Sequence, residues 1–337
     1  MHSDLGEFEL IQRFFKTRAK ATLASDNRRI LLGIGDDCAL IQASPQEEIA
    51  VTSDMLVEGR HFFTNANPQW LGHKALAVNF SDLAAMGAKP IGFTLAIALP
   101  QANSEWLAAF SSGLFDLAEQ FSCPLIGGDT TAGPLNICIT AFGSVPSGKA
   151  IRRSGAIVGD EIWISGCTGD ARLALAALRQ EITLSDAELQ TVQPRLHQPT
   201  PRIPLGISLR DVAHSAIDLS DGLLGDLKHI LEASQVDAQI FLEKLPKSAT
   251  LKKQDQAIQN QFAANGGDDY ELCFTAPENK HDLVLKISKE LSLNLTPIGS
   301  ITAMTSSKPK IAIFDGDQTL LSDTATASLL QSFDHFA

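Results

Sequence analysis

The sequence predicts an α/β protein with mixed sheets, divided into two domains. Segments in which apolar residues recur at helical spacing alternate with short apolar runs bounded by Gly or Pro, a pattern typical of layered helices and strands. The 337 residues exceed what one hydrophobic core usually organises. A small, polar and glycine-rich run at residues 146–160 separates two series of such segments. We therefore expect one domain over residues 1–148 and a second over residues 149–337.

The first domain is expected to interleave helices with strands. Residues 6–15 have the spacing of a helix, and the run at 47–56 indicates a strand that leads into an acidic turn. The remaining elements are a helix over 73–88, a strand over 91–99, a helix over 104–121 with Ser104 as its cap, and strands over 123–131 and 135–145.

The second domain repeats this alternation after the junction. We expect a strand over 160–166, a helix over 170–179, a helix that begins near Leu223, a strand over 238–245, a helix over 281–291 and a strand over 310–316. Both series of elements therefore predict α/β layering.

Composition limits the partners and the compartment. A net charge of -12 argues against a general nucleic-acid or anionic-membrane surface. No segment reaches the roughly 20 apolar residues of a membrane span, and the first residues lack the basic start and apolar run of a secretory signal. The five cysteines are odd in number and widely spaced, which favours reduced thiols over a disulfide framework. We therefore expect a cytoplasmic protein.

Aspartates beside Gly, Ser or Thr recur at the ends of apolar runs. Six of them follow strand-like runs and one lies in a predicted helix: Asp36, Asp37, Asp54, Asp129, Asp218, Asp221 and, in the helix, Asp82. Singly, each suits a helix cap or a turn. Ligand sites gather at strand ends in α/β folds, however, and carboxylates that converge repel one another unless a cation joins them. The set therefore predicts a metal site.

The residue types in this set favour Mg²⁺. This ion prefers oxygen ligands, which the carboxylates and the hydroxyls of Thr52 and Ser53 provide, and it commonly pairs one or two carboxylates with substrate phosphates. No cluster of His or Cys favours zinc or copper. An acidic site can thus hold a nucleotide through Mg²⁺, which indicates phosphoryl transfer. Arg152 and Arg153 offer the further cation that such transfer usually uses.

A phosphate-binding P-loop is an alternative that the sequence disfavours. Residues 143–150, GSVPSGKA, match its glycines and lysine, but Ala150 lacks the hydroxyl that such a loop places on Mg²⁺. The following residues lack the apolar periodicity of a helix, whose N-terminus supplies much of the anion binding. Nucleotide binding is therefore assigned to the acidic turns.

Seven motifs, in their order along the chain, resemble those of the thiamine-monophosphate kinase family. They are GIGDDCAL, TSDMLVEGRHF, HKALAVNFSDLAAMGAKP, GGDTT, AIDLSDGL, GGDDYELCFT and the terminal FDHF. This family belongs to the superfamily of aminoimidazole ribotide synthetase-like ATP enzymes. The resemblance implies an N-terminal α/β domain that binds metal and ATP and forms a homodimer through its sheet. It also implies a C-terminal α/β domain that completes the ATP and substrate site.

The resemblance further implies an activity and a set of site residues. The activity is ATP-dependent phosphorylation of thiamine monophosphate to thiamine diphosphate, the last step of thiamine diphosphate biosynthesis, by in-line transfer with several Mg²⁺ ions. The implied Mg²⁺ ligands are Asp37, Thr52, Ser53, Asp54, Asp82, Asp129, Asp218 and Asp221. The implied ATP contacts are Gly128, Asp129, Arg153 and Ser220, and the implied substrate contacts are His61, Asp268 and Phe333. No further catalytic side chain is implied, because the acceptor's phosphate oxygen is already a nucleophile.

Two positions depart from the family pattern, and two other functions stay open. Asp268 stands where the family has Glu, so Asp269 and Glu271 are alternatives for that contact, and Phe333 stands where some members have Trp. The first alternative function is another ATP enzyme of the same superfamily with a different acceptor. The second is a non-catalytic sensor of Mg²⁺ and nucleotide, which needs no acceptor pocket.

Overall fold

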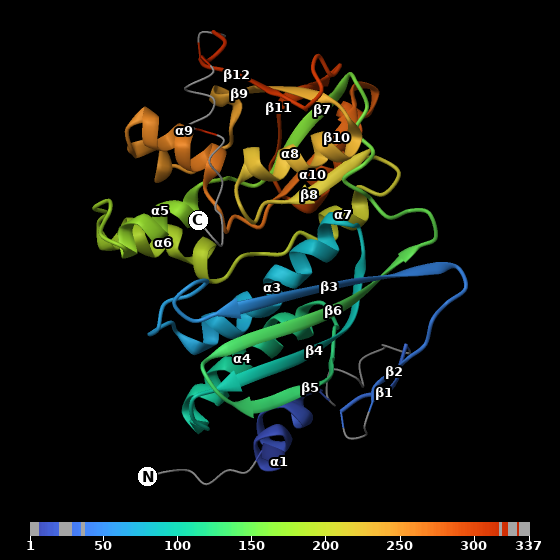
Figure 1. Cartoon of the computed structure of the whole chain (residues 1–337), viewed down its shortest axis with the longest axis vertical. Helices are drawn as coiled ribbons and strands as arrows, with labels where there is room; N and C mark the ends of the chain where they lie inside the picture. The colour runs from blue at the N-terminus through green and yellow to red at the C-terminus, as the bar shows by residue number, and fades with distance from the viewer. Residues whose placement is uncertain (1–6, 20–28, 35–37, 317–318, 323–328, 330–337) are drawn as a thin grey trace. The chain divides into compact units, whose positions relative to one another are not determined.

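Two compact units make up the chain. The structure is a computed structural model, and it describes residues 7–19, 29–34, 38–316, 319–322 and 329. Unit 1 consists of Met1–Leu83 and Ala88–Gly148, and unit 2 consists of Ala84–Gly87 and Lys149–Ala337. Each unit has its own principal sheet with helices packed on it (Figure 1). The α/β class with mixed sheets that the sequence predicts is therefore confirmed.

Unit 1 is built on a four-stranded sheet in the order β3-β6-β4-β5. Its elements are α1 (Glu7–Leu10), the π-helix η1 (Ile11–Lys16), β1 (Ile30–Leu32), β2 (Leu40–Ile41), β3 (Glu47–Val57), α3 (Pro68–Ala85), β4 (Lys89–Leu99), α4 (Ser104–Gln120), β5 (Leu125–Ala132) and β6 (Asn136–Pro146). The β4–β5 pair is parallel, and the other two pairs are antiparallel. Strands β1 and β2 form a separate pair.

The two faces of this sheet differ in burial. Side chains alternate between faces along a strand, and Leu95 and Ile97 of β4 are buried on the face that α3 and α4 cover (Figure 1). On the other face, Ile49, Val51 and Met55 of β3 are 39%, 59% and 53% exposed. The sheet of unit 1 therefore has one helix-covered face and one open face with exposed apolar side chains.

Helices α3 and α4 both begin with an Asn cap that the sequence analysis missed. The Asn67 Oδ1 atom accepts hydrogen bonds from the backbone of Gln69 (2.9 Å) and Trp70 (3.3 Å), so α3 begins five residues before the predicted start. Asn103, not Ser104, caps α4 by accepting from the backbone N–H groups of Glu105 and Trp106. The predicted Ser104 cap is wrong by one residue, because the side chain of Asn103 reaches both orphan donors.

Unit 2 is built on a six-stranded sheet in the order β12-β9-β11-β7-β10-β8. Its elements are β7 (Asp160–Ser165), α5 (Asp170–Leu178), α6 (Asp186–His197), α7 (Ile203–Ser208), β8 (Ser215–Asp218), α8 (Leu223–Ser234), β9 (Asp237–Phe241), η2 (Leu242–Lys244), η3 (Leu251–Lys253), α9 (Gln256–Asn265), β10 (Leu272–Pro277), η4 (Glu278–Lys280), α10 (His281–Leu291), β11 (Leu295–Thr302) and β12 (Ile311–Phe314). Only the β12–β9 pair is parallel among these described strands.

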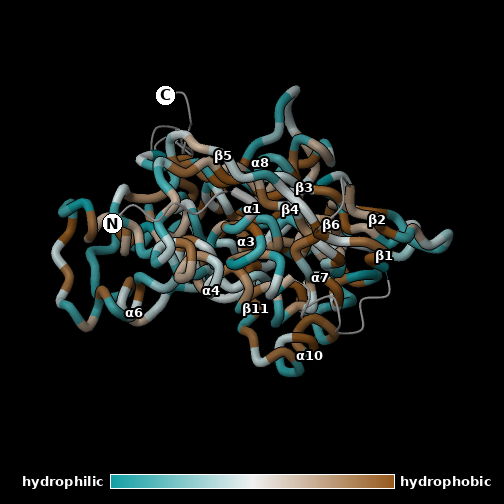
Figure 2. Tube along the Cα trace, turned by 90° about the horizontal axis from the view of Figure 1, so that it is seen from below, coloured by the Kyte–Doolittle hydropathy of each residue, from teal (hydrophilic) through white to brown (hydrophobic). Residues whose placement is uncertain are grey.

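The core of unit 2 lies between this sheet and its helices. Leu223, Leu227 and Ile230 of α8 are fully buried at helical spacing, and they pack in one cluster with Ile164 of β7. Helix α10 is amphipathic instead, and its trace changes between hydrophobic and hydrophilic colours in Figure 2. No helix in the described part of the chain is both long and apolar enough to cross a membrane.

Most predicted elements appear, with differences at their ends and several additions. The helix over 6–15 is split into α1 and the π-helix η1, and the strand over 238–245 ends at Phe241, where a 3₁₀ turn begins. Helices α6, α7 and α9 and strands β10 and β11 were not predicted from the sequence, whereas β8 coincides with the strand-like run before Asp218. No helix follows the P-loop-like run, whose first residues belong to β6, so rejection of that motif is confirmed.

Close contact between α3 and α4 depends on two glycines, which gives the first testable expectation. A Cβ atom at Gly113 would lie 1.8 Å from the Gln69 carbonyl oxygen, and one at Gly72 would lie 2.0 Å from that of Phe110. We expect Gly113→Ala to lower the free energy of unfolding by about 1–3 kcal/mol, because backbone cannot yield as a flexible side chain can. Urea unfolding followed by circular dichroism measures the change.

The matched control is Gly133→Ala. A Cβ atom there would meet only the Ala98 side chain at 3.5 Å, an ordinary contact, so stability should be unchanged. Equal stability of Gly113→Ala and wild type would contradict the role given to this helix contact.

Candidate functional site

In unit 1, the structure brings together three of the predicted metal ligands. Thr52 and Asp54 lie two residues apart on β3, so both side chains point to the helix-covered face. Asp82 comes from α3 on that face, and its Oδ2 atom accepts a hydrogen bond from the Thr52 hydroxyl. Thr52, Asp54 and Asp82, here called the unit 1 acidic cluster, therefore meet across the interface between the sheet and a helix.

The electrostatics of this cluster favour a cation. Burial raises the pKa of Asp54 to about 7, and the charge of Asp82 and a hydrogen bond to it act in the same direction. The Asp54 Oδ2 atom is buried and has no hydrogen-bond partner in the described structure. Two carboxylates and a hydroxyl, all oxygen donors, fit Mg²⁺, which would relieve the repulsion and use the orphaned oxygen.

Two other predicted ligands of unit 1 lie on the open face of the sheet. The register pairs Ser53 with Thr140 of β6, and their hydroxyl oxygens are 2.9 Å apart. Asp129 of β5 pairs with Ala96 of β4, is exposed, and accepts a hydrogen bond from the Thr130 N–H. Within unit 1, Ser53 and Asp129 are thus on the opposite face from the acidic cluster. In the described parts of the chain, no three side chains of His, Cys, Asp or Glu are grouped closely enough to hold a metal ion.

Gly128, a predicted ATP contact, lets β5 approach β4 closely. Its φ of +145° is in a region that side-chain-bearing residues rarely adopt, and a Cβ atom would lie 1.9 Å from the Leu95 carbonyl oxygen. The glycine therefore fixes the path of the chain that carries Asp129.

His61, a predicted substrate contact, follows β3 and is held by that strand. Its Nδ1 atom accepts a hydrogen bond from the Val57 N–H at 3.0 Å. Because a backbone N–H can only donate, the neutral ring carries its proton on Nε2. The half-buried ring can thus donate a hydrogen bond from Nε2 to an anion.

In unit 2, Asp218, Ser220 and Asp221 lie on the turn from β8 into α8. Asp218 ends the strand and is buried, while Ser220 and Asp221 are half-buried. Asp226, one helical turn further, accepts hydrogen bonds from the backbone N–H groups of Asp221 (3.2 Å) and Gly222 (3.1 Å). Burial and the charge of Asp221 raise the pKa of Asp226 to about 7. The sequence shows Asp226, but only the structure gives it the role of holding this turn.

The structure separates the three acids that the sequence left as alternatives. Glu271 is fully buried and binds Arg195 and Arg202, at 2.6 Å to the Arg195 guanidinium. Asp269 is buried too, and both of its oxygens accept from the Gly169 N–H at 3.0 Å. Asp268 is half-buried, and its backbone N–H donates to the Ser220 carbonyl at 2.8 Å. Of these three acids, Asp268 alone reaches solvent, beside the turn that carries Ser220 and Asp221.

Arg153, a predicted ATP contact, is exposed, and its carbonyl accepts a hydrogen bond from the Ser234 hydroxyl at 2.9 Å. The preceding residue, Arg152, forms an isolated β-bridge with Ser215 of β8. Asp37 and Phe333 lie outside the described residues.

Comparison with known proteins agrees with this fold. The family models described as AIR synthase related protein, N-terminal domain, and AIR synthase related protein, C-terminal domain, match residues 35–145 and 158–311. The two units thus define a protein of the AIR synthase related class. The chain is 45% identical over 302 residues to the thiamine-monophosphate kinase of Escherichia coli K12, covering 88% of this chain and 91% of the relative. The chain belongs to the thiamine-monophosphate kinase family.

Solved structures support the same assignment. The crystal structure of thiamine-monophosphate kinase from Stenotrophomonas maltophilia K279a is 44% identical with a TM-score of 0.83, covering 91% of this chain and 96% of that chain. The structure of AaThiL complexed with AMPPCP and TMP is 28% identical with a TM-score of 0.73, covering 100% of this chain and 99% of that chain.

The unit 1 acidic cluster predicts that Mg²⁺ stabilises the protein more at about pH 8 than at about pH 6. Folding raises the pKa of Asp54 from 3.8 to about 7. Without metal, the stability that the protonated carboxyl group contributes is therefore lost as the pH rises through that interval. At the lower pH a proton must leave before the ion binds. Thermal melting with and without MgCl₂ measures the difference.

The control for this experiment is Asp54→Asn, which cannot ionise. We expect its Mg²⁺-dependent rise in Tm to be smaller and nearly independent of pH. An equal rise in the wild-type Tm at both pH values would show that Asp54 does not take part in binding.

Proposed function

We propose that this chain transfers the γ-phosphate of ATP to thiamine monophosphate in a reaction assisted by Mg²⁺ held on its acidic clusters. As a member of its family, the chain is an ATP-dependent thiamine-phosphate kinase that forms thiamine diphosphate. The observation that carries this conclusion is the 45% identity to thiamine-monophosphate kinase over 88% of the chain. A non-catalytic sensor or an enzyme with another acceptor would not be expected to share that much sequence with these kinases.

The proposed metal ligands are the acids and hydroxyls that the sequence analysis identified. They are Asp37, Thr52, Ser53, Asp54, Asp82 and Asp129 of unit 1, and Asp218 and Asp221 of unit 2. Bound Mg²⁺ would neutralise phosphate charge during transfer. The geometry of Thr52, Asp54 and Asp82, with an orphaned carboxylate oxygen, supports this proposal most directly.

The proposed substrate contacts have complementary chemistry. His61 can donate from Nε2 to the phosphate of thiamine monophosphate, Asp268 offers a carboxylate to the cationic part of the molecule, and Phe333 offers an aromatic ring. Gly128, Arg153 and Ser220 are the proposed contacts to ATP, with Asp129. The acceptor phosphate is largely dianionic at neutral pH, so the residues need to position it rather than remove a proton.

We also propose the division of labour between the domains and the assembly. Residues 1–148 would bind metal and ATP and form a homodimer, and residues 149–337 would complete the ATP and substrate contacts. The open face of the unit 1 sheet, with Ile49, Val51 and Met55, supports a homodimer because exposed apolar sheet faces tend to be covered. We place the enzyme in the cytoplasm, which its five free cysteines support.

Asp54→Asn is expected to lower the rate of thiamine diphosphate formation by at least about 100-fold, because a neutral amide is a poor Mg²⁺ ligand and transition-state charge would be left without its cation. Incubation with ATP, Mg²⁺ and thiamine monophosphate, followed by chromatography of both products, measures this rate. The wild-type enzyme should form thiamine diphosphate and ADP in equal amounts.

Asp211→Asn is the matched control, because Asp211 is an exposed acid paired with Lys149, and it should retain full activity. If wild type forms ADP without thiamine diphosphate, the acceptor is a different molecule. If Asp54→Asn keeps full activity, the metal assignment is wrong while the activity stands.

Val51→Lys is expected to convert a homodimer into a monomer, because it places a charge in the centre of the exposed apolar side chains of β3. Light scattering coupled to size-exclusion chromatography measures the mass. Leu283→Lys, at an exposed position on α10, is the control and should leave the mass unchanged. A monomeric wild type, or a dimeric Val51→Lys variant, would refute the proposed interface.

A further inference from the structure

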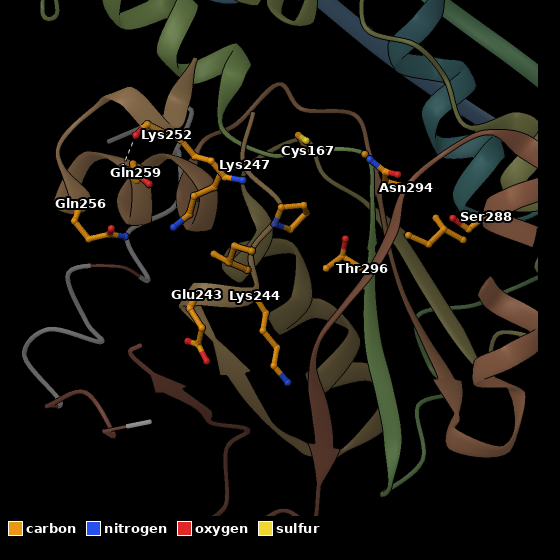
Figure 3. Close-up of a pocket in the computed structure, with 14 residues that line it drawn as sticks. Cys167, Glu243, Lys244, Lys247, Lys252, Gln256, Gln259, Ser288, Asn294 and Thr296 are labelled. Atoms are coloured by element: carbon orange, nitrogen blue, oxygen red, sulfur yellow. Dashed lines mark hydrogen bonds between the residues drawn. The ribbon is translucent and has the colours of Figure 1, made fainter. Parts of the chain in front are cut away.

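Unit 2 contains a pocket, and none of the predicted site residues that the structure describes line it. Its volume is about 660 Å³, and it lies where β7 and β9 end and β11 begins. Figure 3 shows Lys247 and Lys252 on one side of the pocket, Asn294 and Thr296 on the other, and Cys167 near its rim. Asp218 lies at the end of β8, two strands from β7, roughly 10 Å away at the usual strand spacing. Asp218, Ser220 and Asp221 of the acidic turn are not among the residues that line the pocket.

Lys247 is the unusual residue of this pocket. It is only 8% exposed, and its Nζ atom donates to the Asn260 Oδ1 atom at 2.8 Å. That oxygen also accepts from the Gln256 side chain at 2.8 Å, so it is satisfied without the lysine. Across the described residues, no carboxylate lies within salt-bridge distance of Lys247 or Lys252. Within salt-bridge distance, the buried ammonium thus has a neutral partner only, and the Glu243 carboxylate acts on it from further away.

This arrangement carries an electrostatic cost that an anion would remove. Burial lowers the pKa of Lys247, and the nearby positive charge of Lys252 lowers it further. The Glu243 carboxylate acts in the opposite direction without reversing the shift. Glu243 lines the pocket too, but its side chain points away from the two lysines in Figure 3. A buried charge without an opposite charge destabilises the fold, whereas a doubly charged anion between two ammonium groups would be held by both.

The other lining groups define the rest of the ligand. Gln259, Asn294 and Thr296 offer uncharged hydrogen-bonding groups, and no aromatic residue is among the described residues of the lining. Burial and the nearby acids raise the pKa of the Cys167 thiol, so it is a weak nucleophile there and the pocket is suited to binding, not to covalent chemistry.

We propose that this pocket binds the phosphate group of a small molecule with a hydroxylated body, of the sugar phosphate class. The phosphate would lie between the ammonium groups of Lys247 and Lys252. The body would be bound by the Asn294 amide and the Thr296 hydroxyl on the far wall and by the Gln259 amide on the lysine side. The volume exceeds what a phosphate ion alone would fill. The site goes beyond the kinase activity, because none of its described lining residues belongs to the proposed metal, ATP or thiamine monophosphate contacts.

Isothermal titration calorimetry of the full chain tests this proposal. The titrations use inorganic phosphate, ribose 5-phosphate and ribose, with EDTA present and without nucleotide, so that metal-dependent binding at the acidic clusters is removed. We expect saturable binding of ribose 5-phosphate, and a loss of affinity of about tenfold or more in Lys252→Gln and Lys247→Met, because each removes a charge-assisted hydrogen bond. If ribose 5-phosphate binds more tightly than inorganic phosphate, the pocket recognises a phosphate ester. If the two bind with equal affinity, the pocket recognises free phosphate.

The control is Lys253→Gln, since Lys253 is the neighbour of Lys252 but pairs with Glu188 at 2.8 Å, and its affinity should equal that of wild type. Lys247→Met should also keep or raise the Tm of the ligand-free protein, because it removes a buried charge. A lower Tm with unchanged affinity would make Lys247 a structural residue. The proposal would be overturned if neither phosphate compound bound saturably. It would also be overturned if Lys252→Gln and Lys247→Met bound as tightly as the Lys253→Gln control. The kinase activity would be untouched by that result, because no turnover enters the measurement.

Discussion

Repulsion between carboxylates is the constraint on which the functional parts of this fold depend. Asp54 and Asp82 meet because a sheet strand and a helix are packed together. The pKa of Asp54 rises because the carboxyl group is buried and the charge of Asp82 lies beside it. Gly72 and Gly113 allow the close packing of α3 on α4, and α3 carries Asp82. The core thus stabilises a pair of acids that would separate in a flexible chain, and a metal-free cluster of this kind is predisposed to bind a divalent cation.

In unit 2, the buried acidic side chains are stabilised by partners within the protein. Glu271 is neutralised by Arg195 and Arg202, which leaves it no capacity for a ligand. Asp226 is instead held by backbone N–H groups, and it fixes the turn that carries Asp221. Glu271 and Asp226 are buried and bound by internal partners, whereas Asp268 is only half-buried. In unit 2, some acidic residues therefore hold the backbone in place, and others are available for our proposed ligand contacts. Burial and the number of internal partners distinguish the two groups.

The pocket lined by Lys247 and Lys252 shows the same effect of burial on like charges, with the sign reversed. The protein has a net charge of -12, so carboxylates are more numerous than cationic side chains. The ammonium group of Lys247 is nevertheless buried beside an amide, with no carboxylate at salt-bridge distance among the described residues. Carboxylates thus lie together where we propose that Mg²⁺ binds, and lysines line the pocket where we propose that a phosphate binds. Overall charge predicted the absence of a broad anion-binding surface, but it carries no information about one enclosed pocket.

The sequence by itself determined the α/β class, the strands and helices with strong periodicity, and the acidic turns, because these depend on local spacing and on residue chemistry. It also determined the family, since seven ordered motifs are more specific than any one of them. Only the tertiary structure decided that Asp54 meets Asp82 while Ser53 and Asp129 lie on the other face, because strand register sets which way each side chain points. Likewise, the bonds from Arg195 and Arg202 to Glu271 join residues 76 and 69 positions apart, and no local pattern encodes such contacts.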